Sequence, residues 1–223
     1  MKGIVPVPVR TPLVEPGDDI CAVVARCVAG LARNGDVIAL SETAVAIAQN
    51  QTIRAEHIRP GRLAYALAQR AGPLATVSQP ESLQLVIDRV GAWRVLLAAS
   101  AHVIGTLTGR RGLFYALMGD AITAMDGYTG TMPPFERTIV LAPQDPDGVA
   151  ISVTEYTGVD CAIVDANDLR RAKVLGASAA VRRDVVASAL LSNPAGNSDE
   201  QTPIVILKWR GDGDNPLLEP AIT

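Results

Sequence analysis

Short apolar runs that alternate with helix-forming segments constrain the fold of this chain more than any other feature of its sequence. Runs of β-branched and aliphatic residues predict buried strands at Val37–Leu40, Ile139–Leu141, Cys161–Val164 and Ile204–Trp209. Between them lie stretches whose apolar residues recur every three or four positions, which is typical of helices. This alternation predicts an α/β or α+β domain.

Capping residues and prolines place further elements. Gly3–Val9 is predicted to be an edge strand because its prolines cannot donate to a neighbouring strand. Helices are predicted after Asp18 and Asp19, at 60–71 and 80–90, after the cap Asp145 with Pro146 as first residue, and at 182–191; a strand is predicted at 173–177. Periodicity does not separate helix from strand between Trp93 and Met125.

The composition excludes several classes of function. Aromatic residues make up 4% of the chain and the net charge is −3, so neither stacking platforms nor a basic surface for nucleic acid is expected. The uncharged run from Val95 to Gly109 is shorter than the about 18–20 residues that span a bilayer. The proline-containing start is unlike a secretory signal, and no cysteine lies in a CxxC pair. We expect a cytoplasmic protein with reduced thiols and no membrane partner.

Polar residues gather directly after two of the predicted strands. Ser41 follows one strand, and Asp165, Asn167 and Asp168 follow another. Ligands of open α/β sheets bind outside the carboxyl ends of strands, and carboxylate and amide oxygens suit Mg²⁺ or Mn²⁺. The same residues form an Asx-turn and a helix cap equally well, so both interpretations stay open.

Two loops carry a high density of hydrogen-bonding groups. Ser192–Pro203 can present amides and carboxylates to a ligand, or can simply connect a helix to a strand. Asp126–Thr131 contains glycines that let backbone N–H groups approach an anion, although a plain turn has the same composition. No GxxxxGK[ST], GxGxxG or HExxH motif is present, which disfavours a conventional P-loop, a dinucleotide fold and a zincin.

Four segments in order resemble one known family. They are Gly35–Ser41 followed by Ala44–Ala48, then Ile139–Asp147, then Ala162–Asn167, and finally Pro203–Ile206. Together they are similar to the coenzyme F420-0 glutamate ligase family, over roughly residues 3–209. This resemblance implies a mixed-sheet α/β (α+β) fold in one domain at 1–209, a flexible tail at 210–223, and an intertwined homodimer.

The resemblance also implies a chemistry. Members join L-glutamate to the phosphorylated acceptor F420-0 through an amide bond, with GTP as co-substrate and two divalent cations, Mg²⁺ or Mn²⁺. The acceptor carboxylate is expected to become an acyl phosphate, which the glutamate amine then attacks. Small-molecule substrates are therefore the expected partners besides a second copy of the chain.

Site residues are carried over one position at a time. The metal ligands implied are Asp165, Asp126, Asp199 and Glu200. The nucleotide or substrate contacts implied are Ser41, Gly127, Thr129, Asn167, Asn193 and Asn197. No catalytic residue is assigned. The chain departs from the family where Val164 and Ala166 replace two threonines, where Thr129 stands in place of an aspartate, and where Ile47 replaces a lysine.

These departures keep other functions open. A non-catalytic protein on the same fold would bind a phosphorylated metabolite or a nucleotide without turning it over. An unrelated α/β enzyme would share the strand pattern alone. Metal-dependent binding of GTP favours the ligase, whereas metal-free binding of a phosphate ester favours the binding protein.

Overall fold

The structure is a computed structural model, and it describes residues 3–71, 78–107, 109, 113–119, 125–126, 134–167, 171–196 and 201–219. The chain divides into two compact units. We call residues 1–51 with 143–223 the sheet unit and residues 52–142 the inserted unit. The single ligase-like domain expected over 1–209 stays a prediction.

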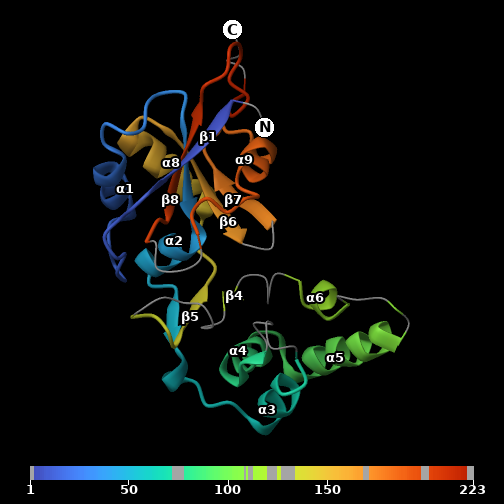
Figure 1. The fold of residues 1–223 in the computed structure, drawn as a ribbon. Coiled ribbons are helices and arrows are strands. Elements are labelled where there is room, and N and C mark those ends of the chain that lie inside the picture. The colour runs from blue at the N-terminus through green and yellow to red at the C-terminus, as the bar shows by residue number, and fades with distance from the viewer. Residues whose placement is uncertain are drawn as a thin grey trace. The chain divides into compact units, whose positions relative to one another are not determined.

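The sheet unit is built on a mixed sheet with strand order β1-β8-β2-β6-β7 (Figure 1). Its strands are β1 (Ile4–Val9), β2 (Val37–Ser41), β6 (Asp160–Asn167), β7 (Arg171–Ala177) and β8 (Ile204–Trp209). β2 and β6 run parallel, and the other neighbouring pairs are antiparallel. The mixed α+β class is therefore confirmed, and the prolines of β1 lie on an edge strand as predicted.

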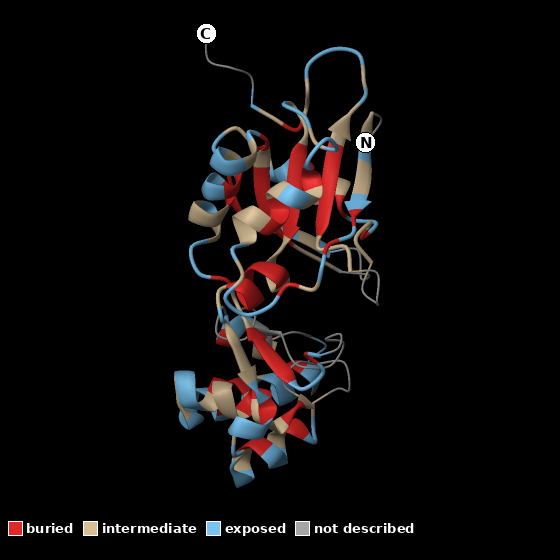
Figure 2. Cartoon of the chain, turned by 90° about the vertical axis from the view of Figure 1, so that its left-hand side faces the viewer, coloured by how far each residue is buried: buried red, intermediate tan, exposed pale blue. Residues whose placement is uncertain are grey.

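Helices cover both faces of this sheet. The helices of the sheet unit are α1 (Ile20–Val28), α2 (Glu42–Ala48), α8 (Pro146–Thr157) and α9 (Arg183–Ala189). Ile38, Ile163 and Ile206 pack with α1 and α8 on one face, whereas Ala39 and Val205 pack with α9 on the other. Figure 2 shows the resulting buried strands at the centre of this unit. Successive residues of a strand face opposite sides of the sheet, and both sides are covered by helices here. This explains why the strands are nearly continuous apolar runs in the sequence.

Caps predicted from the sequence begin two of these helices. The Asp19 side chain accepts a hydrogen bond from the Ala22 N–H, and α1 starts at the next residue, Ile20. The Asp145 side chain accepts from the Gly148 N–H, and Pro146 is the first residue of α8.

The inserted unit contains a small sheet and several helices. Its strands, in the order β3-β5-β4, are β3 (Thr52–Arg54), β5 (Thr138–Leu141) and β4 (Met125–Asp126). Its helices are η1 (Ala55–His57), α3 (Arg62–Ala68), α4 (Pro80–Val90), α5 (Ala92–Leu107) and α6 (Leu113–Met118). Leu83, Val86 and Val95 form its core together with Ile139. The segment that periodicity left undecided is thus largely helical where it is described.

Two residues of the tail after Trp209 contact the sheet unit. Leu217 is fully buried against the α9 face, and its carbonyl accepts a hydrogen bond of 2.9 Å from the Arg182 N–H. The Glu219 N–H donates to the Ala180 carbonyl at 2.7 Å. Burial of one leucine and two backbone hydrogen bonds hold Leu217 and Glu219 against the sheet unit, and the flexible tail at 210–223 stays a prediction.

No helix within the described residues is long and apolar enough to cross a membrane.

Candidate functional site

The carboxyl ends of the parallel strands β2 and β6 lie side by side. Ser41, the last residue of β2, is in register with Val164 of β6, so Asp165 follows immediately beyond it. These are the strand ends at which the sequence predicted a site, and the structure brings Ser41 and Asp165 together as neighbours in one sheet.

The start of β8 borders the same strand ends. The Ser41 N–H donates to the Pro203 carbonyl at 2.8 Å, and the Thr11 N–H donates to the Gln201 carbonyl at 2.9 Å. β8 runs antiparallel to β2, with Ile204 opposite Leu40. The segment Gln201–Pro203 therefore lies beside Ser41, so the loop that the sequence singled out before the last strand ends at the candidate site.

Asp165 is the carboxylate at this site. Burial raises the pKa of Asp165 above its ordinary value of 3.8, and the charge of Lys173 acts in the opposite direction. None of the hydrogen bonds or ion pairs found among the described residues involves Asp165. A half-buried carboxylate without such a partner is costly in a purely structural position, so it marks a functional candidate.

The strand reaches further than predicted. Asp165 and Asn167 were expected in a loop after β6, but the backbone stays in the sheet through Asn167 because β7 continues to pair with it. Asp165 is opposite Lys173, and Asn167 is opposite Arg171. The Asx-turn interpretation is therefore wrong for Asp165, which lies within the strand. The side chain of Asn167 and the whole of Asp168 lie outside the described part of the chain, so for them both interpretations stay predictions.

The remaining predicted residues fall into three groups. Asn193 is buried and left-handed (φ 45°), and its N–H donates to the Leu190 carbonyl at 2.9 Å, so it closes the turn after α9. Asp126 lies in β4 of the inserted unit, where its backbone alone is described. Outside the described residues lie Gly127, Thr129, Asn197, Asp199 and Glu200.

Of the predicted metal ligands, Asp165 is the one whose side chain the structure describes at these strand ends. Within the described ranges, no three His, Cys, Asp or Glu side chains come close enough together to hold a metal ion. The Asp165 carboxylate, half-buried and without a hydrogen-bond donor, fits one ligand position for a hard cation.

Sequence reasoning missed a pair of glutamines that fixes the segment before α8. The Gln49 side chain accepts from the Gln144 N–H at 2.7 Å and donates to the Gln144 carbonyl at 2.9 Å. This reciprocal pairing joins the end of α2 to the start of α8 across 95 residues of sequence. Neither residue has a local signal, because the contact depends on the fold alone.

Sequence reasoning also missed the role of Asp147. Its carboxylate accepts from the Ala177 N–H at 2.9 Å and pairs with the Arg183 guanidinium. The hydrogen bond from Ala177 is the main reason that the pKa of Asp147 lies below its ordinary value, with Arg183 adding to the effect. This residue joins α8, β7 and α9, so its role is structural.

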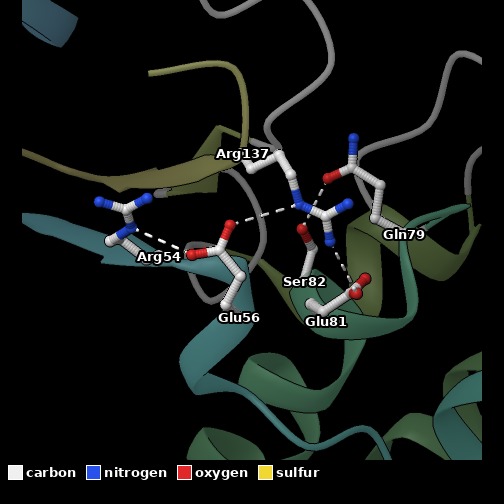
Figure 3. Close-up of polar contacts among 6 residues, drawn as sticks. All are labelled: Arg54, Glu56, Gln79, Glu81, Ser82 and Arg137. Carbon is white, nitrogen blue, oxygen red and sulfur yellow. Dashed lines mark hydrogen bonds and ion pairs between the residues drawn. The ribbon is translucent and has the colours of Figure 1, made fainter. Parts of the chain in front are cut away.

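The inserted unit carries a different set of charges (Figure 3). Arg137 lies between Glu56 and Glu81, with N–O distances of 3.7 and 3.9 Å, and Arg54 pairs with Glu56 at 3.1 Å. Nearby, the buried Ser82 hydroxyl donates to the Gln79 side chain at 2.9 Å at the start of α4. These ion pairs connect β3, η1, the residue before β5 and α4, and they offer no reactive group.

Comparison with known proteins identifies the relationship. A family model described as F420-0:Gamma-glutamyl ligase matches residues 8–168. The match includes β2, β5, α8 and β6, and thus the strand ends that carry Ser41 and Asp165. A search of the curated proteins finds no match.

Proposed function

Because the chain belongs to the F420-0:gamma-glutamyl ligase family, we propose that it is a nucleotide- and metal-dependent amide ligase that adds L-glutamate to a phosphorylated, F420-0-like acceptor. The family is one of ligases, and the resemblance of the strand ends supports the finer assignment. The observation that carries it is the half-buried Asp165 carboxylate at the carboxyl end of the parallel pair β2 and β6.

The proposed reaction proceeds in two balanced steps. The γ-phosphoryl group of GTP passes to the acceptor carboxylate, which releases GDP and forms an acyl phosphate. The amine of glutamate then attacks the acyl carbon, phosphate leaves with the bonding electron pair, and the amine loses a proton. Mg²⁺ or Mn²⁺ would neutralise the charge of the triphosphate when bound. Asp165 would hold a cation, and the Ser41 hydroxyl would face the same strand ends.

The proposal includes a homodimer. Six large apolar side chains of α5 and α6 are more than two-fifths exposed: Trp93, Leu96, Leu97, Val103, Ile104 and Leu117. Monomeric proteins rarely expose so many neighbouring apolar residues, and a second copy of the chain would bury them.

Calorimetric titration with Mn²⁺, with and without GTP, tests the site. We expect GTP to bind in the presence of the metal, and Asp165→Asn to weaken Mn²⁺ binding about tenfold because one charged oxygen ligand is lost. Asp184→Asn is the matched control, because Asp184 is an exposed carboxylate of α9 in the same unit. Equal Mn²⁺ affinity of the parent and Asp165→Asn would contradict the assignment of Asp165.

A second candidate is a binding protein without catalysis, favoured by the replacement of the family's lysine by the buried Ile47. Turnover separates the two. Formation of GDP and of a glutamyl amide, detected by mass spectrometry, supports the ligase. Metal-free binding of a phosphate ester with no product would favour the binding protein instead.

A further inference from the structure

The hairpin of β6 and β7 contains an irregularity in its register. Ile163 is opposite Gly176, but the next residue, Val164, is opposite Val174. Leu175 is therefore the extra residue of a β-bulge. Bulges occur frequently next to active sites, where they change the direction of a side chain.

The bulge decides which residue faces Asp165. If the register of Ile163 and Gly176 continued without the extra residue, Val174 would lie opposite Asp165 and Lys173 opposite Ala166. With the bulge, Lys173 lies opposite Asp165. One inserted residue thus places a cation, rather than an apolar side chain, beside the half-buried carboxylate.

The burial of the residues of β7 agrees with this register. Ala172 and Val174 pack against the cluster under α9, whereas Arg171 and Lys173 are exposed. Side chains alternate along a strand, so Arg171 and Lys173 share the face opposite to α9 with their cross-strand partners. No hydrogen bond or ion pair within the described part of the chain involves Lys173, so its ammonium group is not committed to a structural contact.

Asp165 and Lys173 lie beyond the first turn of α8, on the side away from the rest of this helix. A Cβ atom on Gly176 would come within 2.2 Å of the Pro146 carbonyl carbon, so α8 begins directly over Gly176. The helix then runs towards Gly158, from which the chain enters β6 at Asp160. α8 therefore covers the first half of β6 and runs away from the level of Asp165 and Lys173, where Lys173 is exposed.

The start of α8 does not itself supply an anion site. Asp145 accepts from the Gly148 N–H, and the carboxylate of Asp147 occupies the first turn. These two negative side chains satisfy the positive end of the helix. Positive charge on this face of the hairpin comes instead from Lys173 and Arg171.

We propose that Lys173 binds a phosphate group of the substrate next to Asp165, with Arg171 as a second cation on the same strand. The identity of the phosphate-bearing substrate rests on the proposed function, whereas the anion site itself rests on the register of the hairpin. A lysine ammonium is a compact charge that binds phosphate well. Lys173 is a binding residue in this proposal and takes no proton.

Inorganic tripolyphosphate without metal is the probe, titrated calorimetrically into the full chain at about 0.1 M salt. We expect Lys173→Met to weaken binding at least tenfold and Lys173→Arg to lose no more than about threefold, because charge is kept. Arg182→Gln is the matched control, since it also removes one positive charge from the sheet unit but lies at the start of α9. The affinity of Arg182→Gln for tripolyphosphate should equal that of the parent. The melting temperature of every variant should lie within a few degrees of that of the parent.

Each outcome bears on the proposal. Equal affinity of Lys173→Met and the parent, or no binding of tripolyphosphate to the parent, would overturn it. An equal loss in Arg182→Gln would show general charge attraction and would overturn it as well. The proposed function is tested separately with GTP and Mn²⁺. If GTP does not bind with Mn²⁺ but Lys173→Met still weakens the binding of tripolyphosphate, the ligase is rejected and the anion site is retained.

Discussion

The sheet unit and the inserted unit bury their apolar residues in different ways. In the sheet unit, helices cover both faces of the sheet, and residues such as Ile38 and Ile163 are completely buried. In the inserted unit, α5 buries Val95 and Ala98 but leaves Trp93 65% and Ile104 60% exposed. The first unit has its core between the sheet and its helices, whereas the second exposes an apolar surface on α5, where we propose that a second copy packs.

The same contrast extends to charged residues. Asp147 in the sheet unit joins three elements, and Lys208 pairs with Asp36 at 3.2 Å where both side chains are largely buried. In the inserted unit, the ion pairs of Arg137 with Glu56 and Glu81 are longer, at 3.7 and 3.9 Å, and the Arg137 side chain is 60% exposed (Figure 3). Electrostatic interactions therefore contribute to the packing of the first unit and little to that of the second.

Removal of a core side chain should have the largest effect. Ile163→Ala in β6 deletes a fully buried side chain between α8 and the sheet, so we expect a loss of about 3 kcal/mol in the free energy of unfolding. Ile104→Ala removes the same atoms from the exposed face of α5 and should cost less than about 0.5 kcal/mol within one chain.

Urea unfolding followed by circular dichroism, at a concentration where the chain is monomeric, compares the two variants. Similar losses for both would contradict the contrast between the two units.

A charge on the exposed face of α5 should affect assembly next. Leu97→Asp places a carboxylate where we propose that a second copy packs, so the dimer should weaken at least about a hundredfold, or about 2.8 kcal/mol. Ile151→Asp on α8 is the control, because Ile151 is an exposed apolar residue of the sheet unit. Light scattering measures the mass of each variant across concentration. A parent that keeps the mass of one chain at every concentration would refute the dimer.

The sheet unit was more predictable from sequence than the inserted unit. Its strands are short apolar runs, and caps such as Asp19 and Asp145 act within four residues, so local patterns suffice. α5 could not be assigned because its exposed side is apolar as well, which removes the helical periodicity between Trp93 and Leu107. In a sequence, an apolar surface that packs against another chain has the same run of apolar residues as a buried core.

The candidate site was predictable only in part. Asp165 and Ser41 follow apolar runs, and this local signal led to two adjacent parallel strands, although β6 continues for two residues past Asp165. Lys173 could not be found in this way, because its position opposite Asp165 depends on a bulge at Leu175 and on the pairing of β7 with β6. The docking of Leu217 depends likewise on a surface formed by α9, more than twenty residues earlier.

Protonation of Asp147 should have a smaller effect, confined to acid. Its folded-state pKa lies below the ordinary 3.8, so the carboxylate stabilises the fold above about pH 4, and this contribution is lost as the pH falls through the folded pKa. The side chain is half exposed, so screening limits the effect to about 1 kcal/mol. Asp147→Asn should therefore be less stable than the parent at pH 7, and the two should converge below pH 4 in thermal melts. A difference that persists unchanged at pH 3 would contradict this assignment.

Removal of Arg137 should have the smallest effect. Its contacts with Glu56 and Glu81 measure 3.7 and 3.9 Å, and its side chain is 60% exposed, so water and salt screen both pairs. We expect Arg137→Gln to change the free energy of unfolding by less than about 0.5 kcal/mol, and the change should vanish at about 1 M salt. Arg183→Gln in the sheet unit is the matched comparison, because it removes the same charge from the carboxylate that joins α8, β7 and α9. Urea unfolding at low and high salt measures both. If Arg137→Gln costs more than Arg183→Gln, the charges of the inserted unit contribute to its packing after all, and the difference between the two units lies in their apolar surfaces alone.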